Sequence, residues 1–296
     1  MGRLMKAFFF KLARDLTFRI TLIIGAAMAV VITLLYFIVQ SFLTDALGEG
    51  MDGVKFLCGQ GMLISSMSPI QNFGLVIPIN LIIFTCLEFS HGTIRNKIIA
   101  GNSKFKIYAS LYLTGLVFAL SLLFVYIFIC TGLGSIFGGF NLKDAVFSGL
   151  NASRYTVEYI LKMLLICLVT YACIVSMTIF FAALFRSIGP CIPIVIILLL
   201  GCYYLVSITS VVALFLDEDQ SEILLNIFRI VDPLYAIASS ETQGVNPVMT
   251  EYGLEYEYYI AKMNDVTFYG GLANNIVYAG AFFGFGALIF TKRDIK

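Results

Sequence analysis

Six long apolar stretches dominate this sequence and leave few folds open to it. None carries a charged residue through its middle, and they cover Thr21–Leu43, Pro69–Phe89, Lys106–Thr131, Val157–Phe185, Ile188–Leu216 and Phe268–Phe290. A helix needs about 20 apolar residues to cross the hydrocarbon core of a bilayer. Only helices and closed barrels satisfy their backbone groups in lipid, and runs of this length favour helices. The sequence therefore predicts an all-α polytopic membrane protein with six transmembrane helices in a single domain over residues 1–296.

The charge content agrees with this interpretation. Charged residues make up only 12% of the 296 residues, whereas hydrophobic residues make up 60%. A soluble domain has about 25% charged residues, so this composition excludes an ordinary soluble enzyme and a disordered chain. The net charge of +1 argues against nucleic-acid binding, which needs a basic surface. The lipid bilayer is the first partner that the sequence predicts.

Six spans place both termini on the same side of the membrane, and most basic residues are predicted to lie on that side. Thirteen of the 19 Lys and Arg residues fall there, namely Arg3, Lys6, Lys11, Arg14, Arg19, Arg95, Lys97, Lys104, Lys106, Arg186, Lys292, Arg293 and Lys296. Only three of the 18 acidic residues share this side: Asp15, Glu88 and Asp294. The positive-inside rule places both termini in the cytoplasm. We expect a multi-pass protein of a bacterial plasma membrane.

A basic segment, Arg3–Arg19, precedes the first span. Met5, Phe9 and Leu12 share one face of a helical wheel, and the basic residues lie toward the other face. This spacing predicts an amphipathic helix in the cytoplasmic interface. The alternative is a stretch of positive charge beside a span with no role of its own.

The loop between the second and third spans contains a short predicted helix. Residues from Thr93 to Ala100 form it, Gly101 suits the left-handed position that ends a helix, and Ser103 can cap the next span. Ile94 and Ile98 lie one turn apart and offer an apolar ridge, which suits docking into a groove of a partner. A positively charged connector that meets lipid headgroups is the alternative.

The sequence lacks the motifs of the common enzyme and carrier classes. It has one histidine, no Gly-Lys dipeptide of a phosphate-binding loop and no Gly-x-Ser-x-Gly elbow. We therefore expect no enzymatic activity and no cofactor or metal site in this chain. The span centres carry no charged side chain, which argues against the hypothesis of an ion-coupled carrier. The acidic segment Asp217–Thr267 is expected to be a long outer loop, with an interfacial or re-entrant part over Glu222–Ser240.

Two segments give the chain a family resemblance. Glu88-Phe-Ser-His-Gly-Thr-Ile-Arg-Asn-Lys-Ile-Ile-Ala-Gly-Asn-Ser-Lys104, with Ile107-Tyr108, resembles the first cytoplasmic loop of type-2 ABC exporter permeases, and Phe290-Thr-Lys-Arg-Asp-Ile295 resembles their C-terminal tail. These permeases are six-span membrane subunits that pair with a separate ATP-binding-cassette subunit. The resemblance therefore implies such an ATPase as partner, with ATP and Mg bound by the partner, and a second permease copy that is identical or different.

The resemblance also implies roles for particular residues. Their coupling helix falls on Gly92–Gly101, where Ile94 and Ile98 would enter the groove of the ATPase. The polar register would come from Arg95, Asn96 and Lys97, and Glu88 would sit where the second span meets this helix. The interface implied is Glu88, Gly92, Thr93, Ile94, Arg95, Asn96, Lys97, Ile98 and Gly101. The amphipathic elbow helix of the family falls on Arg3–Arg19.

Polar residues in the second and fifth spans are candidate contacts along a transport pathway between two permease copies. They are Gln71, Asn72 and Asn80 in the second span, and Tyr203, Tyr204, Ser207 and Ser210 in the fifth. Hydrogen bonding between neighbouring helices is the alternative role for such residues.

Three functions remain open from the sequence. The first is the membrane subunit of an ATP-driven exporter for a hydrophobic or amphipathic molecule, such as an antimicrobial peptide or a lipid. The second is an ion-coupled carrier or channel that acts alone. The third is a membrane scaffold or sensor that transports nothing. The loop motif favours the first.

Overall fold

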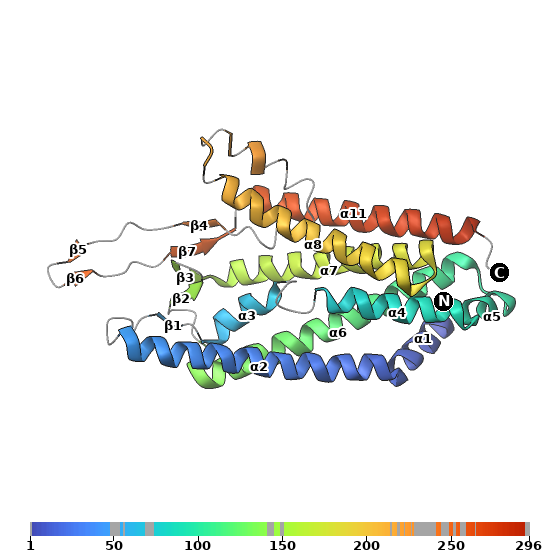
Figure 1. Cartoon of the computed structure of the whole chain (residues 1–296), viewed down its shortest axis with the longest axis horizontal. Coiled ribbons are helices and arrows are strands. Elements are labelled where there is room, and N and C mark those ends of the chain that lie inside the picture. The colour runs from blue at the N-terminus through green and yellow to red at the C-terminus, as the bar shows by residue number, and fades with distance from the viewer. Residues whose placement is uncertain are drawn as a thin grey trace.

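The computed structural model describes residues 2–47, 54–55, 57–68, 74–140, 145–148, 151–213, 215–217, 220–221, 223–225, 227, 241–243, 249–250, 253–254, 259–263 and 265–293. Long helices run side by side along the longest axis of the molecule, and both chain ends lie at the same end of the bundle (Figure 1). That end also carries the short helix α5 (Thr93–Ile99) and is called the α5 end below.

The all-α membrane fold is confirmed. Five described helices are long and apolar enough to cross a bilayer: α2 (Leu16–Leu47), α6 (Lys104–Gly138), α7 (Val157–Phe185), α8 (Ile188–Ala213) and α11 (Asp265–Lys292). A sixth span is counted if α4 (Val76–Ser90) and α5 are taken as one broken helix, with a bend of 56° between them. The protein is therefore a multi-pass membrane protein.

The second predicted span differs most from its expected bounds. The helix begins at Val76 rather than at residue 69, because Gly74 and Leu75 form a turn. Its 15 residues reach about 22 Å at 1.5 Å per residue, which is less than the roughly 30 Å of hydrocarbon. A separate helix, α3 (Gly59–Met67), precedes it. Pro78 lies in the first turn of α4, where its missing N–H costs no hydrogen bond.

The predicted interfacial helix over residues 3–19 is wrong at its C-terminal end. Helix α1 covers Gly2–Arg14 and α2 begins at Leu16. Asp15 separates them, because its Oδ1 accepts hydrogen bonds from the backbone N–H of Thr17 at 2.8 Å and of Phe18 at 3.4 Å. A carboxylate in this position caps the start of a helix and so favours a new helix over a continued one.

Helix α7 lies at the centre of the bundle, against α11, α4, α6, α8 and α3. Its residues Tyr171, Val175 and Ile179 are almost completely buried. Gly115 of α6 lies against Val175 and Ile179, so the two helices approach closely where a larger residue would separate them. The core of the molecule therefore follows α7.

Short strands lie at the end of the bundle opposite to α5 (Figure 1). A five-stranded sheet has the order β1-β2-β3-β7-β4 and a two-stranded one joins β5 to β6. Within the larger sheet β1/β2 and β3/β7 pair parallel, and β2/β3 and β4/β7 pair antiparallel. The strands are β1 (Val54–Lys55), β2 (Ala145–Ser148), β3 (Asn151–Tyr155), β4 (Glu241–Gln243), β5 (Met249–Thr250), β6 (Gly253–Leu254) and β7 (Tyr259–Lys262). The expected outer loop over 217–267 supplies β4 to β7, and most of its predicted re-entrant part lies outside the described residues.

Candidate functional site at the α5 end

Two glycines frame the short helix that follows α4. Gly92 has φ +66° and is the N-cap of α5, and Gly101 has φ +84° just beyond its C-cap. A left-handed conformation suits glycine because a side chain would clash there. The predicted roles of Gly101 and of Ser103 are confirmed, since the Ser103 hydroxyl accepts a hydrogen bond from the Lys106 N–H at the start of α6. The chain thus turns sharply on both sides of α5.

Glu88, near the end of α4, is the centre of the site. Its side chain is completely buried, and its Oε2 accepts hydrogen bonds from Lys97 Nζ at 2.8 Å and from Thr93 Oγ1 at 2.6 Å. Its Oε1 accepts a hydrogen bond from Lys11 Nζ of α1. The Thr93 hydroxyl also lies 2.8 Å from the Glu88 backbone carbonyl. One carboxylate therefore connects α1, α4 and α5.

Helix α1 contributes an apolar side to the same cluster. Its buried residues are Leu4, Phe8 and Leu12, so the buried face is rotated by about one residue from the one predicted with Met5 and Phe9. The ammonium of Lys97 lies 3.3 Å from the centre of the Phe8 ring, a favourable cation–π arrangement. The interfacial helix is thus packed against the rest of the chain as well as amphipathic.

The predicted apolar docking ridge is corrected by the structure. The Ile94 side chain is only 1% exposed and belongs to the main hydrophobic core, where Ile107 and Phe290 also lie. Ile98 is half-buried and packs against the same core. Both isoleucines therefore anchor α5 to its own chain. The sequence pattern identified the apolar face of α5 correctly but assigned it to a partner, because a 3.6-residue spacing alone does not show which surface a face contacts.

The opposite face of α5 is open. Arg95 and Asn96 are exposed, and the Ile99 side chain is 73% exposed. Phe105 and Lys106, in the first turn of α6, are also exposed. The predicted interface residues therefore divide into two groups. Glu88, Thr93, Ile94, Lys97 and Ile98 hold the helix in place, whereas Arg95, Asn96 and Gly101 are exposed, and Gly92 is intermediate.

Basic side chains cap two helices beside this surface. Lys104 Nζ donates to the backbone carbonyls of Thr291 and Arg293, each at 3.1 Å. Arg293 Nη1 donates to the carbonyl of Leu184 near the end of α7, at 2.6 Å. Cations are favourable at helix C-termini, where carbonyl groups lack helical partners. Lys104 and Arg293 thus have structural partners within the bundle.

The segments that carry the family resemblance lie close together in space. The rings of Tyr108 and Phe290 have centroids 5.6 Å apart, and those of Phe89 and Phe290 are 5.9 Å apart. Gly286 of α11 lies directly against the Tyr108 ring, so α11 and α6 are in close contact at this point. The end of α11 therefore packs against α4 and α6, the two helices that flank α5 in the sequence.

The candidate pathway residues do not form a single cluster in the described part of the chain. Asn80 donates to the Val76 carbonyl of its own helix at 3.0 Å. Tyr203 packs against a second buried cluster, while Tyr204 is 59% exposed. Gln71 and Asn72, and the side chains of Ser207 and Ser210, lie outside the described residues.

Lys11 is the residue of this site that sequence reasoning missed. The sequence did contain one indication of a basic partner. Glu88 is an isolated acidic residue at the end of an apolar span, on the predicted cytoplasmic side, which has few acids. A carboxylate in such a position needs a cationic partner, and Lys11 and Lys97 both lie on the same predicted side. Choosing Lys11 over the other basic residues required the packing of α1. Within the described ranges no group of three His, Cys, Asp or Glu side chains is placed to hold a metal.

Comparisons with known proteins give a family but no named relative. Neither the curated proteins nor the solved structures contain a match to this chain. The model of the family described as "Protein of unknown function (DUF2705)" matches residues 46–296, which is most of the chain, and the chain therefore belongs to this family.

Proposed function

We propose that this chain is the membrane subunit of an ATP-driven ABC exporter, and that α5 is the helix through which a separate ATPase subunit acts on it. In this proposal the α5 end faces the cytoplasm of a bacterial plasma membrane. ATP and Mg are bound by the partner. The transported molecule is hydrophobic or amphipathic, such as an antimicrobial peptide or a lipid, and two permease copies enclose its path.

One observation carries the proposal. A seven-residue helix stands across the end of the bundle, fixed from within by Glu88 and Ile94, and presents Arg95, Asn96 and Ile99 outward. A helix held this firmly transmits a push to α4 and α1, because the buried carboxylate connects all three. The mixture of one apolar and two polar side chains suits a groove in a soluble partner.

The exposed face of α5 gives the sharpest test. Ile99→Asp places a charge where an apolar contact is expected, and we expect at least a tenfold loss of the ATPase that co-purifies in mild detergent, or about 1.4 kcal/mol of binding free energy. Mass spectrometry of the purified complex would identify the ATPase and show whether the second permease is identical. Arg95→Glu should weaken the same complex.

A matched control separates partner binding from folding. Ile136, at the far end of α6, is 76% exposed, so Ile136→Asp makes the same chemical change away from α5. It should leave the ATPase bound. The proposal fails if the wild-type chain purifies alone under several gentle conditions, or if Ile99→Asp and Ile136→Asp behave alike. Transport by the purified chain in liposomes without ATP would favour a carrier or channel instead.

A further inference from the structure

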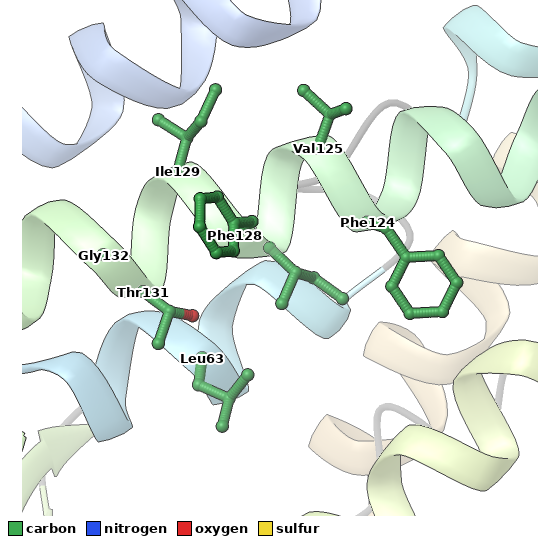
Figure 2. Close-up of a pocket in the computed structure, with 8 residues that line it drawn as sticks. Leu63, Phe124, Val125, Phe128, Ile129, Thr131 and Gly132 are labelled. Carbon is green, nitrogen blue, oxygen red and sulfur yellow. The ribbon is translucent and has the colours of Figure 1, made fainter.

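An apolar groove of about 690 Å³ lies along α6 (Figure 2). Its residues belong to the second half of this helix, away from α5. The wall of the groove consists of seven α6 residues between Phe124 and Gly132, without Tyr126 and Cys130, together with Leu63 of α3. The Phe128 side chain is 79% exposed and that of Phe124 is 49% exposed. The volume lies within the range of about 300–1,000 Å³ that is typical of small-molecule sites.

The chemistry of the wall selects the occupant. All lining side chains are hydrocarbon except that of Thr131. The Thr131 Oγ1 is buried, so it presents almost no polar surface to the groove. A polar or charged molecule would lose its hydration here without compensation. This wall therefore favours an apolar occupant such as a hydrocarbon chain.

The position of the groove indicates where that chain comes from. Phe124 and Gly132 lie 20 and 28 residues beyond the start of α6 at Lys104, which is about 30 Å and about 42 Å along the helix axis. A bilayer is about 40–45 Å thick including its headgroups. The groove therefore lies in the outer part of the leaflet far from α5, next to its headgroups, and this is the outer leaflet in the orientation proposed above.

We propose that this groove retains one acyl chain of a phospholipid from that leaflet. The chain lies along Phe128 and Phe124 beside Leu63, and the headgroup lies at the membrane surface near Gly132. This site does not depend on the ATPase or on transport. It is a fixed lipid contact between α3 and α6, distinct from the lipids that exchange freely around the bundle.

The absence of tryptophan from the sequence makes a direct experiment possible. Phe128→Trp would carry a single tryptophan in the groove, and Ile276→Trp would carry a single tryptophan on α11, where Ile276 is 59% exposed. Both positions lie at similar distances from the ends of their helices that are remote from α5. Each variant is reconstituted in phosphatidylcholine with dibrominated acyl chains, which quench tryptophan fluorescence. It is then extracted and washed extensively in maltoside detergent.

We expect Phe128→Trp to keep more than half of its quenching after washing and Ile276→Trp to recover its full fluorescence. Gly132→Leu in the Phe128→Trp background fills the groove, because nothing lies within 4 Å of a Cβ at Gly132. This double variant should fold normally, as judged by its melting temperature, and should lose the retained quenching. Equal recovery in both single variants would overturn the proposal, as would retention that Gly132→Leu does not change.

Discussion

The two ends of the bundle use the same chemistry in opposite surroundings. At the α5 end, Glu88 is completely buried and binds Lys11 and Lys97. At the other end, Lys162 of α7 binds Glu158 and Asp265, each at 2.8–2.9 Å, but these two acids are 75% and 73% exposed. In both clusters one charged side chain binds two partners of opposite charge and so joins neighbouring helices. The clusters differ in the exposure of their carboxylates: water can solvate Glu158 and Asp265 but does not reach Glu88.

This difference decides what each cluster can do. An exposed ion pair contributes little, because water and salt solvate both charges almost as well. A buried carboxylate that loses its partners is left without compensation, so its neighbours must keep their positions. We infer that the α5 end is built as a rigid unit, whereas the ion pairs at the opposite end can open at little cost.

A large effect is expected from Glu88→Gln. The substitution keeps the size of the side chain but removes the charge that holds Lys11 and Lys97, whose side chains are 43% and 21% exposed. Because water can solvate the freed lysines in part, the expected loss is that of the charge-assisted hydrogen bonds, about 1.5–3 kcal/mol. Denaturant titration in mixed micelles should show this loss of unfolding free energy. Glu158→Gln makes the same change at the exposed cluster and should have no measurable effect. Equal effects of the two substitutions would contradict the comparison.

A comparable effect is expected from the apolar anchor of α5. Ile94→Ala should lower the unfolding free energy by about 2–4 kcal/mol, because it leaves a cavity in the core. Ile99→Ala, on the exposed face of the same helix, should change it by less than about 0.5 kcal/mol. The two substitutions distinguish the anchoring of α5 to its own chain from the proposed binding of α5 to the ATPase. Only Ile99→Ala should weaken ATPase binding without lowering stability. If Ile94→Ala is as well tolerated as Ile99→Ala, α5 is not anchored as the structure shows.

The helical architecture could be predicted from the sequence because apolar run length is a local property. The bounds predicted for the fourth span, Val157–Phe185, are those of α7, and α6 and α11 extend beyond their predicted bounds by two to seven residues at each end. The second span was misjudged, since hydrophobicity does not report the turn at Gly74 and Leu75. The break at Asp15 depends on a capping bond that charge patterning alone does not reveal.

The candidate site was only partly predictable. Glu88, Lys97 and the glycines around α5 were identified from one continuous segment, but Lys11 lies 77 residues away from Glu88. The inward direction of Ile94 depends on residues as distant as Phe290. Contacts between remote segments follow from the packing of whole helices, and a single sequence does not encode them in any local pattern.

Lys162→Met, which removes the shared cation of the exposed cluster, should have only a small effect. Glu158 and Asp265 remain solvated when their lysine partner is removed, so the melting temperature should fall far less than for Glu88→Gln. The residual effect should shrink in 1 M salt, because charges exposed to solvent are screened strongly there. The effect of Glu88→Gln should persist, because a buried carboxylate is screened much less. Melting curves of both variants at low and high salt make the measurement. A large decrease in the melting temperature of Lys162→Met that persists at high salt would show that the two ends are equally rigid. That result would argue against α5 as the part of the molecule that transmits motion.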